Sequence, residues 1–568
     1  MLLFNPKNYD GADVDPKTRD ILLKTIEFFE KKGLKRIKED DQASVWYDDF
    51  LEFVKKEKVF ASLLTPTGYG DEDSRWDMWR IAKMNEILGF YGLCYWYTWQ
   101  VSILGLGPVW MGSNEEAKHR AAKLLKDGGI FAFGLSEKEH GADIYGTDMM
   151  LYPKGDGAYV ARGDKYYIGN GNEAALVSVF AKMADTGEYV FFAVDSKHPN
   201  YECVKKISTS GVRQAYVAEF ALHDYPITEA DILSRGQLGW DSSLNTVNVG
   251  KYQLGWASVG ICTHAFYEAI DHAANRNLYG KFVTDFPHVK KIFTEAYARL
   301  AAMRLFALRA CDYMRAADGK DRRYLLYNPI QKMKVTMEGE KVVGLLHEVI
   351  AAKGFEQDTY FEMAIRDIGM LPKLEGTTHV NIALVAKFMK NFLFAPAEYP
   401  EVPKRNDRSD DAYLFNQGPA AGLSKITFHD YRASFDGIKS ANLDIFKEQI
   451  DEFKDFLAKA APDEKQAKNM DYMLQVGELF TLIPYAQLIC ENKKIYGVDD
   501  VIIDEIFNFI VRDFSAYALR LYTGQENSDR QNELILKMLR KPSQDQAGFN
   551  EVWEKYVYVL RGSYRMNQ

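Results

Sequence analysis

The spacing of hydrophobic residues predicts a helical unit at the start of the chain. In the stretch MWRIAKMNEILGFYG, which begins at Met78, apolar residues recur every three or four positions, as along one face of a helix. The stretch NEEAKHRAAKLLKDGG has the same period, can be capped by Ser113 or Asn114, and ends at glycines. We therefore expect an N-terminal helical domain over residues 1–129.

The pattern changes near residue 130 to short runs rich in β-branched and aromatic residues. These runs are AYVARGDKYYIGNG, ALVSVFAKM, YVFFAVDS and AYVAEFALHD. Turn tripeptides separate some of them, Gly-Asp-Gly at 155–157 and Asp-Thr-Gly at 185–187. The pattern predicts an antiparallel β domain over residues 130–240, with its last strand ending near residue 235.

From about residue 243 the helical period returns in four long segments. They are VGKYQLGWASVGICTHAFYEAIDHAANRN, HVKKIFTEAYARLAAMRLFALRACDYMRAA, PIQKMKVTMEGEKVVGLLHEVIAAKG and THVNIALVAKFMKNFLF. Short joins between long helices favour an antiparallel arrangement. We expect a four-helix bundle over residues 241–395.

The last part of the chain reads as a linker followed by more helix. Residues 395–411 are rich in Pro, Asp and Arg, and beyond them Phe446, Ile450, Phe453 and Leu457 fall on one helix face. We expect residues 396–568 to hold this linker and a C-terminal helical domain. The predicted fold class is therefore mostly α with a central antiparallel, barrel-like β domain.

Charge and cysteine content exclude several classes of protein. The chain has 568 residues and a formal net charge of -9, so a chain-wide attraction to nucleic acid or to an anionic membrane is not expected. Its five cysteines are far apart and none has C-x-x-C spacing, which indicates neither disulfides nor a metal site. The N-terminus turns acidic too early for a signal peptide. We expect a cytoplasmic protein.

One uncharged run, from Ile87 to Asn114, is long enough to span a membrane. The alternative is a buried helix, a loop and the start of a second helix. Gly105, Gly107 and Pro108 interrupt the run, and membrane helices favour unbroken apolar stretches. We therefore expect buried helices and no transmembrane segment.

No G-x-S-x-G, H-E-x-x-H or Walker motif occurs, and the candidate chemistry lies in four other segments. They are FAFGLSEKEHGAD at 131–143, KYYIGNG at 165–171, RNLYGK at 276–281 and GFEQDTYFEMAIRDIGMLPKLEGT at 354–377. In this order, and with the order helix, sheet, bundle, the chain resembles the acyl-CoA dehydrogenases over about residues 20–395. The fourth segment carries most of the resemblance, because its R-D and E-G-T match without a gap.

The resemblance implies that Glu375 is a catalytic base. The α-proton of a thioester is weakly acidic, so a carboxylate removes it only when the carboxylate is desolvated and the developing enolate is stabilised. By pattern alone, Glu375 beside Thr377 reads as a helix-capping carboxylate. Some relatives carry the base on the first bundle helix, where this chain has Gly250, so Glu375 is the one candidate.

The resemblance also implies an FAD cofactor whose flavin accepts the β-hydride. The implied FAD-binding residues are Phe133, Leu135, Ser136, Tyr167, Ile168, Gly169, Arg276, Glu348, Thr377 and His379. Arg276 is implied to reach the FAD of a partner subunit. Each residue also has an ordinary reading: Phe133 as core, Arg276 as a solvated helix end and His379 as a helix-start residue.

The implied substrate-binding residues are Ala142, Asn248, Lys251 and Gly376, with no metal. Several positions depart from the family. Gly169 stands where a threonine hydroxyl usually bonds flavin N5, Tyr167 where tryptophan is usual, Ala142 where serine is usual and Lys251 where arginine is usual. Restoring the hydroxyl by Gly169→Thr is expected to raise the flavin potential, provided that the backbone there suits a β-branched residue.

The acyl pocket is implied to lie near the aromatic cluster Tyr95, Trp96, Tyr97 and Trp99, which otherwise reads as core packing. The C-terminal unit is similar in size to that of the very-long-chain acyl-CoA dehydrogenases, which implies a homodimer. The implied partners are an acyl-CoA substrate and an electron-transferring flavoprotein. Two alternatives stay open: an acyl-CoA oxidase that uses oxygen, and a non-catalytic flavoprotein on the same fold.

Overall fold

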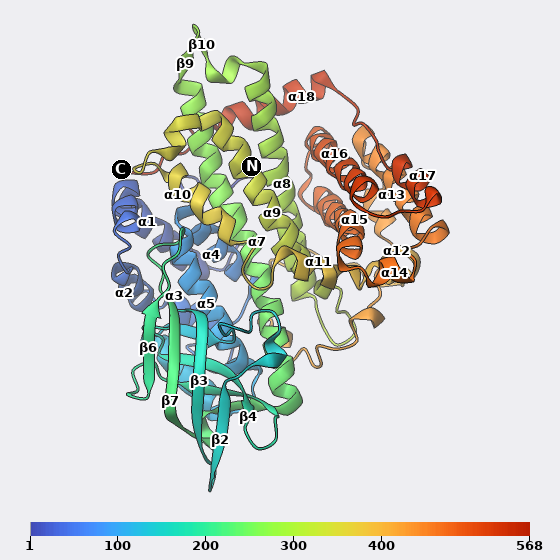
Figure 1. Cartoon of the computed structure of the whole chain (residues 1–568). Helices are drawn as coiled ribbons and strands as arrows, with labels where there is room; N and C mark the ends of the chain where they lie inside the picture. The colour runs from blue at the N-terminus through green and yellow to red at the C-terminus, as the bar shows by residue number, and fades with distance from the viewer. Residues whose placement is uncertain (1) are drawn as a thin grey trace.

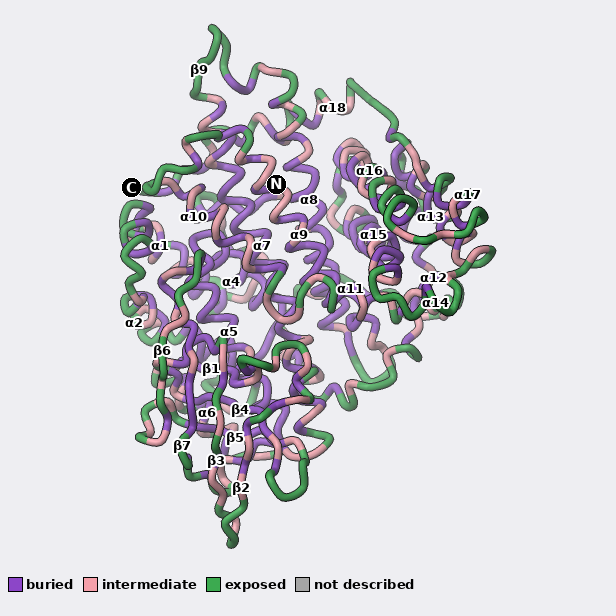
Figure 2. Tube along the Cα trace, viewed as in Figure 1, coloured by how far each residue is buried: buried purple, intermediate pink, exposed green. Residues whose placement is uncertain are grey.

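The computed structural model describes residues 2–568, and the chain begins with tightly packed helices (Figure 1). Two of these helices, α4 (Met78–Tyr91) and α5 (Leu93–Met111), are almost completely buried, as the burial colours of Figure 2 show. The first helices are α1 (Pro16–Gln42), α2 (Asp48–Lys56), α3 (Val59–Leu64), α4 (Met78–Tyr91), α5 (Leu93–Met111) and α6 (Glu115–Lys126).

The uncharged run forms buried helices, but its break is not where the sequence suggested. The chain breaks at Gly92, between α4 and α5, and α5 continues through Gly105, Gly107 and Pro108. Here the glycines permit close packing. A Cβ at Gly105 would lie 2.6 Å from the carbonyl oxygen of Ala132, and one at Gly107 would meet the side chain of Thr246. The missing side chains therefore let α5 lie directly against β1 and α7.

The β domain is one sheet with the strand order β6-β7-β3-β2-β4-β5-β8, and β1 pairs with β4. The prediction of an antiparallel sheet was wrong in one respect, because β1 and β2 both pair with β4 in parallel. Alternation of residue types marks a strand but does not set its direction. The strands are β1 (Phe131–Gly134), β2 (Met150–Gly155), β3 (Ala158–Gly169), β4 (Leu176–Met183), β5 (Tyr189–Val194), β6 (Tyr201–Lys206), β7 (Val217–Thr228) and β8 (Ile232–Arg235).

The three longest helices that follow the sheet in the chain pack against one another at the centre of the molecule (Figure 1). The 40-residue α7 begins directly after β8 and packs against α4, α5 and α9. The predicted fourth long helix is instead two short ones, α11 and α12, separated at residues 387–388. The elements of this part are α7 (Gly236–Asn275), β9 (Asn277–Leu278), β10 (Lys281–Phe282), α8 (Pro287–Arg315), α9 (Tyr324–Ile350), α10 (Tyr360–Asp367), α11 (Thr378–Ala386) and α12 (Met389–Phe394).

The last helices stand beside α8 and α11, at the right of Figure 1. Within residues 2–568 only α15 is long and apolar enough to cross a membrane, and 83% of its most apolar window is buried inside the protein. The last helices are α13 (Ala441–Lys459), α14 (Glu464–Lys468), α15 (Met470–Tyr496), α16 (Asp500–Gly524), α17 (Asp529–Lys537) and α18 (Gln546–Val552).

A buried ion network joins the bundle to these helices. Glu338 of α9 lies 2.6 Å from Arg299 of α8 and 2.7 Å from Lys334, and Arg299 also pairs with Asp513 of α16 at 3.0 Å. Burial acts to raise the pKa of Glu338, but Lys334 and Arg299 hold it well below its ordinary value. The Glu338 carboxylate is therefore ionised and compensates a cluster of buried cations.

We expect Glu338→Gln to lower the free energy of unfolding by about 3–5 kcal/mol, because it leaves buried cations without their counter-charge. Urea denaturation followed by circular dichroism measures the change. Glu526→Gln is the matched control, because Glu526 and its partner Lys465 are both fully solvated. A Glu338 variant as stable as this control would show that the network contributes little.

Candidate active site

Glu375 lies on a tight turn between the 3-10 turn Ile368–Met370 and α11. Its φ is 52° and that of Gly376 is 82°, so two successive residues adopt the left-handed conformation. The next residue, Thr377, is the N-cap of α11 and accepts the Val380 N–H. Glu375 is thus not the capping residue, and its side chain is free to turn inward.

The Glu375 carboxylate points between α5 and α7. Gln100 of α5 donates through Nε2 to Glu375 Oε1, and also to the carbonyl oxygen of Gly250 on α7 at 3.2 Å. A Cβ at Gly250 would lie 2.5 Å from Glu375 Oε2 and 2.6 Å from Leu104 Cδ2. Because residue 250 has no side chain, the Glu375 carboxylate occupies that space. Positions 375 and 250, the two that carry the base in different relatives, are therefore adjacent in the structure.

The free carboxylate oxygen has no partner. Glu375 Oε2 is buried and accepts no hydrogen bond from residues 2–568. Unpaired buried polar atoms are rare and costly in a structural role. An unpaired oxygen on a buried carboxylate therefore indicates a place where a ligand supplies the missing contact.

Burial sets the charge state of this site. It raises the pKa of Glu375 to about 7, against the opposing effects of the Gln100 hydrogen bond and of the positive charges of Lys332 and Lys251. Burial also lowers the pKa of Lys332 to about 7 and that of Lys251 to about 8. Glu375 can thus exchange a proton near neutral pH, as a general base requires.

The structure brings together the two strand segments that the sequence linked to FAD. Ser136 Oγ donates to the carbonyl oxygen of Tyr166 at 2.7 Å, and the Tyr166 N–H donates to the carbonyl oxygen of Ser136 at 3.0 Å. Lys165 Nζ donates to the carbonyl oxygen of Leu135 at 3.0 Å. The loop after β1 and the end of β3 therefore form one continuous surface.

A β-bulge shapes this surface. The pairing of β3 with β7 skips from Tyr166 to Ile168, so Tyr167 lies outside the register, with a φ of 63° and 63% of its surface exposed. Bulges of this kind are common beside active sites, because they free backbone groups and redirect a side chain. The bulge and the adjoining loop at Leu135 and Ser136 fit a flat, hydrogen-bonding ring system such as the flavin of FAD.

There is no free volume beside Gly169 for a larger side chain, and this changes what we expect from the Gly169→Thr substitution. Its φ is outside the left-handed region, so the backbone would accept threonine, but a Cβ would lie 2.6 Å from Val101 Cγ2 and 2.7 Å from Tyr97 Cε1. Tyr97 and Val101 of α5 already fill the place of a side chain. The expectation that Gly169→Thr simply restores a hydroxyl was wrong, because a neighbouring helix occupies that volume.

Some of the remaining predicted residues lie near Glu375 or the strand ends, and two, Arg276 and Glu348, lie far along their helices. Thr377 and His379 lie exposed at the start of α11, close to the base in the chain, while Ile168 and Phe133 are buried and Ala142 is exposed. Arg276 follows the end of α7, 26 residues beyond Gly250, which is ~39 Å along a helix. Glu348 lies 16 residues beyond Lys332 on α9, or ~24 Å. The structure does not bring Arg276 or Glu348 to the base of their own chain.

Sequence reasoning missed three residues of the site: Tyr97, Gln100 and Lys332. Gln100 was visible as a polar residue in an uncharged run, and a fully buried amide in such a run is a usable signal for a site. Tyr97 was placed in the aromatic cluster near the implied acyl pocket, and its contact with Gly169 was not foreseen. Lys332 lies in an amphipathic stretch rich in lysine, where nothing local distinguishes it.

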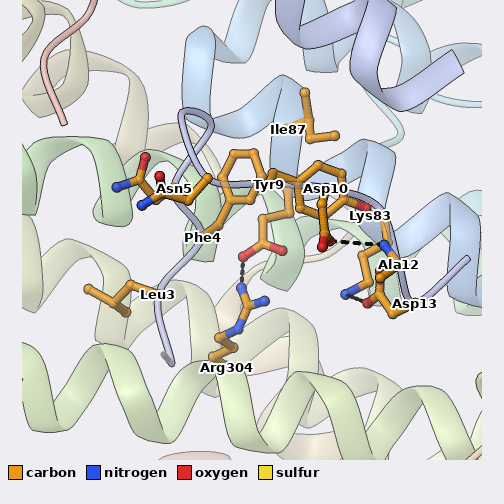
Figure 3. Close-up of a pocket in the computed structure, with 12 residues that line it drawn as sticks. Leu3, Phe4, Asn5, Tyr9, Asp10, Ala12, Asp13, Lys83, Ile87 and Arg304 are labelled. Carbon is orange, nitrogen blue, oxygen red and sulfur yellow. Dashed lines mark hydrogen bonds and ion pairs between the residues drawn. The ribbon is translucent and has the colours of Figure 1, made fainter. Parts of the chain in front are cut away.

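Two other features do not compete with this site. A cavity of about 310 Å³ lies under the N-terminal segment, but its Lys83 pairs with Asp13 at 2.5 Å and its Arg304 pairs with Glu86 (Figure 3). Glu137, His140 and Asp148 are close enough together to hold a metal ion, yet Glu137 already bonds Lys165 at 2.7 Å and two backbone N–H groups. Both clusters satisfy their own charges.

The helical domain, mixed sheet and helix bundle, with a buried carboxylate between α5 and α7, define an FAD-dependent oxidoreductase of the acyl-CoA dehydrogenase fold. The family description "Acyl-CoA dehydrogenase, middle domain" matches residues 132–225, and "Acyl-CoA dehydrogenase, C-terminal domain" matches residues 237–390. The middle and helix-bundle regions that these two descriptions match are therefore similar to those of the acyl-CoA dehydrogenases, and the cofactor is FAD.

Similar proteins extend this assignment. The short-chain specific acyl-CoA dehydrogenase of Megasphaera elsdenii is 21% identical over 64% of this chain and 95% of its own length. The mitochondrial very long-chain specific enzyme of Bos taurus is 24% identical over 54% of this chain and 48% of its own length. The structure of a Bacillus anthracis acyl-CoA dehydrogenase with FAD has a TM-score of 0.73 at 17% identity and covers 99% of this chain and 97% of its own. That fold therefore includes the C-terminal helices.

We expect Gly169→Thr to disturb the site, because the new side chain must displace Val101 and Tyr97. The variant should retain less FAD and unfold at a lower temperature than the parent, as measured by visible absorbance and differential scanning calorimetry. Gly319→Ala is the control, since its φ is outside the left-handed region and a Cβ there meets nothing within 4 Å. A Gly169→Thr protein with full FAD and an unchanged melting temperature would contradict the packing argument.

Proposed function

We propose that the enzyme oxidises an acyl-CoA thioester to the trans-2-enoyl-CoA, with Glu375 as the base that takes the α-proton. The observation that carries this proposal is the buried, unpaired Glu375 Oε2, on a carboxylate whose pKa is raised to about 7 by burial. Such a carboxylate is a stronger base than an exposed one and lies within range of a ligand bound against Gly250.

When bound, FAD supplies the acceptor for the hydride that leaves the β-carbon as the α-proton is removed. The chain's own residues do the rest. Glu375 accepts the proton at Oε2, Gln100 holds the other carboxylate oxygen, and the walls formed by α5 and α7 exclude water from the carboxylate. Ser136, Tyr167 and the bulge at the end of β3 would hold the flavin, while the resemblance assigns Asn248 and Lys251 to substrate binding.

The reducing equivalents would then pass to an electron-transferring flavoprotein, as the similarity to the acyl-CoA dehydrogenases supports. The runner-up is an acyl-CoA oxidase, and mixing the reduced enzyme with air-saturated buffer in a stopped-flow instrument separates the two. Reoxidation within seconds supports the oxidase, and slow reoxidation supports a protein acceptor. A non-catalytic flavoprotein would show no bleaching of the FAD absorbance with any member of an acyl-CoA panel.

We expect Glu375→Gln to retain FAD and to lower the rate of FAD bleaching by a good acyl-CoA at least about 10²-fold, because the amide keeps the shape and loses the basic oxygen. The matched control is Glu340→Gln, a carboxylate that pairs with Lys373 near the surface of the same region. A Glu375→Gln enzyme within a few-fold of the parent would mean that another group is the base.

The parent should also lose activity on the acid side of neutrality. Glu375 works only when it is deprotonated, and burial raises its pKa to about 7, so the bleaching rate should increase with pH up to about that value. A pH profile of the anaerobic bleaching rate measures this limb. A rate that is flat from pH 5 to 8 would contradict the raised pKa of the base.

We further propose a homodimer in which Arg276 contacts the FAD of the partner, since ~39 Å of helix separates it from its own base. Light scattering should give twice the chain mass, and Arg276→Gln should weaken FAD retention. Arg520→Gln is the control, because Arg520 is an exposed residue that pairs with Glu478. A monomer or tetramer, or full FAD retention by the Arg276 variant, would contradict this arrangement.

A further inference from the structure

One buried lysine spans the turn that carries the base. Lys332 lies in the middle of α9, fully buried, and its Nζ donates to the carbonyl oxygen of Pro372 at 2.7 Å and to that of Gly376. These carbonyls lie three residues before and one residue after Glu375. A single ammonium group therefore ties both ends of the turn to the rigid core of the bundle.

The turn requires such a restraint. Glu375 adopts a φ of 52°, which is uncommon for a residue with a side chain and persists only where the surroundings enforce it. Asn381 supplies a second tie, because its Nδ2 donates to the carbonyl oxygens of Gly376 at 3.0 Å and Thr377 at 2.9 Å. Asn381 bonds only the residues that follow Glu375, so among residues 2–568 Lys332 is the one side chain that bonds carbonyls on both sides of Glu375.

Lys332 is also a cation without an ion pair. No carboxylate among residues 2–568 lies within 4.0 Å of Lys332 Nζ, whereas the buried Lys334, two residues further along α9, is paired with Glu338. The charged and titratable groups facing Lys332 are Glu375 and Lys373 on the turn and Lys251 on α7. Of these, only Glu375 is an acid, so Glu375 is the counter-charge of Lys332.

We propose that Lys332 is the positioning residue of the catalytic base: it fixes the 372–376 turn and supplies the positive charge that favours the ionised form of Glu375. This proposal rests on the proposed function in taking Glu375 as the base. In its protonated form the Lys332 amine suits both tasks, because an ammonium group has three donors and a positive charge. A structural lysine would be expected to pair with a carboxylate, as Lys334 does.

The test compares Lys332→Met with Lys373→Met, which makes the same substitution at an exposed lysine of the turn that pairs with Glu340. Misplacing a reacting group by about an ångström costs about 10²-fold in rate, so Lys332→Met should lose about that factor in the FAD-bleaching rate constant at saturating acyl-CoA. The acyl-CoA concentration for half-maximal rate should change little. Lys373→Met should match the parent in both quantities.

The acid limb of the pH profile gives a readout that loss of stability does not move. The positive charge of Lys332 lowers the pKa of Glu375, so its removal should raise that pKa and shift the limb to higher pH by about one unit or more. Lys332→Gln separates the two roles: it retains a donor for the turn and recovers part of the rate, but it keeps the shifted limb. It also serves where Lys332→Met does not fold.

A substrate-free measurement distinguishes failure of this proposal from failure of the proposed function. In pH-difference infrared spectra of the FAD-loaded protein, the carboxylic acid band of Glu375 is the one that Glu375→Gln removes. Its midpoint should move to higher pH in Lys332→Met and Lys332→Gln, whether or not any acyl-CoA bleaches the parent. An unchanged midpoint, or an unchanged rate in an active parent background, would overturn the role of Lys332.

Discussion

The burial of one carboxylate governs the centre of this molecule. Removing Glu375 from water raises its pKa to about 7 and makes it an effective base, but an unpaired buried charge is unstable unless neighbouring groups compensate for it. Compensation comes from three directions: Gln100 on α5, Lys251 on α7 and Lys332 on α9. These helices must therefore approach one another closely, and much of their sequence serves that approach.

The helices approach closely because glycines on one segment leave room for large side chains from another. Gly250 receives the Glu375 carboxylate, Gly169 receives Tyr97, and a Cβ at Gly255 would collide with the side chain of Gln331. Such pairs are set by contacts between distant parts of the chain. They also explain why Gly169 departs from the family: its usual side chain and the Tyr97 ring cannot occupy the same volume.

Buried ion pairs join the C-terminal helices and the linker to the helix bundle. Besides the Glu338 network, Arg309 of α8 bonds Glu491 of α15 at 2.6 Å, and Arg315 pairs with the buried Asp411 of the linker. Removing one partner from such a pair costs more than the pair contributes, so the polar contacts make the domain's position specific. The C-terminal helices thereby hold α9, which carries Lys332, in a fixed position from the outside.

The sequence alone determined the existence of most elements, because residue periodicity is a local property that secondary structure imposes directly. It also indicated Glu375 and the two FAD segments, through their resemblance to segments of the acyl-CoA dehydrogenases. Several features needed the tertiary structure: the parallel pairings of β1 and β2, the break at Gly92 and the division of the last bundle helix into α11 and α12. Each depends on which distant segment packs alongside, which local pattern does not encode.

In the candidate site, too, some residues were indicated by the sequence and others became apparent only in the tertiary structure. Motif matching indicated Glu375 but not the contacts of Gln100, Tyr97 or Lys332, since residues on α5 and α9 acquire a shared role only when those helices and the Glu375 turn meet. It also grouped Arg276 and Glu348 with residues from which α7 and α9 separate them by ~39 Å and ~24 Å of helix. The sequence indicated Glu375 as the candidate that removes a proton. The tertiary structure decided what holds that residue in place and sets its charge, because desolvation and electrostatic compensation act through space and not along the chain.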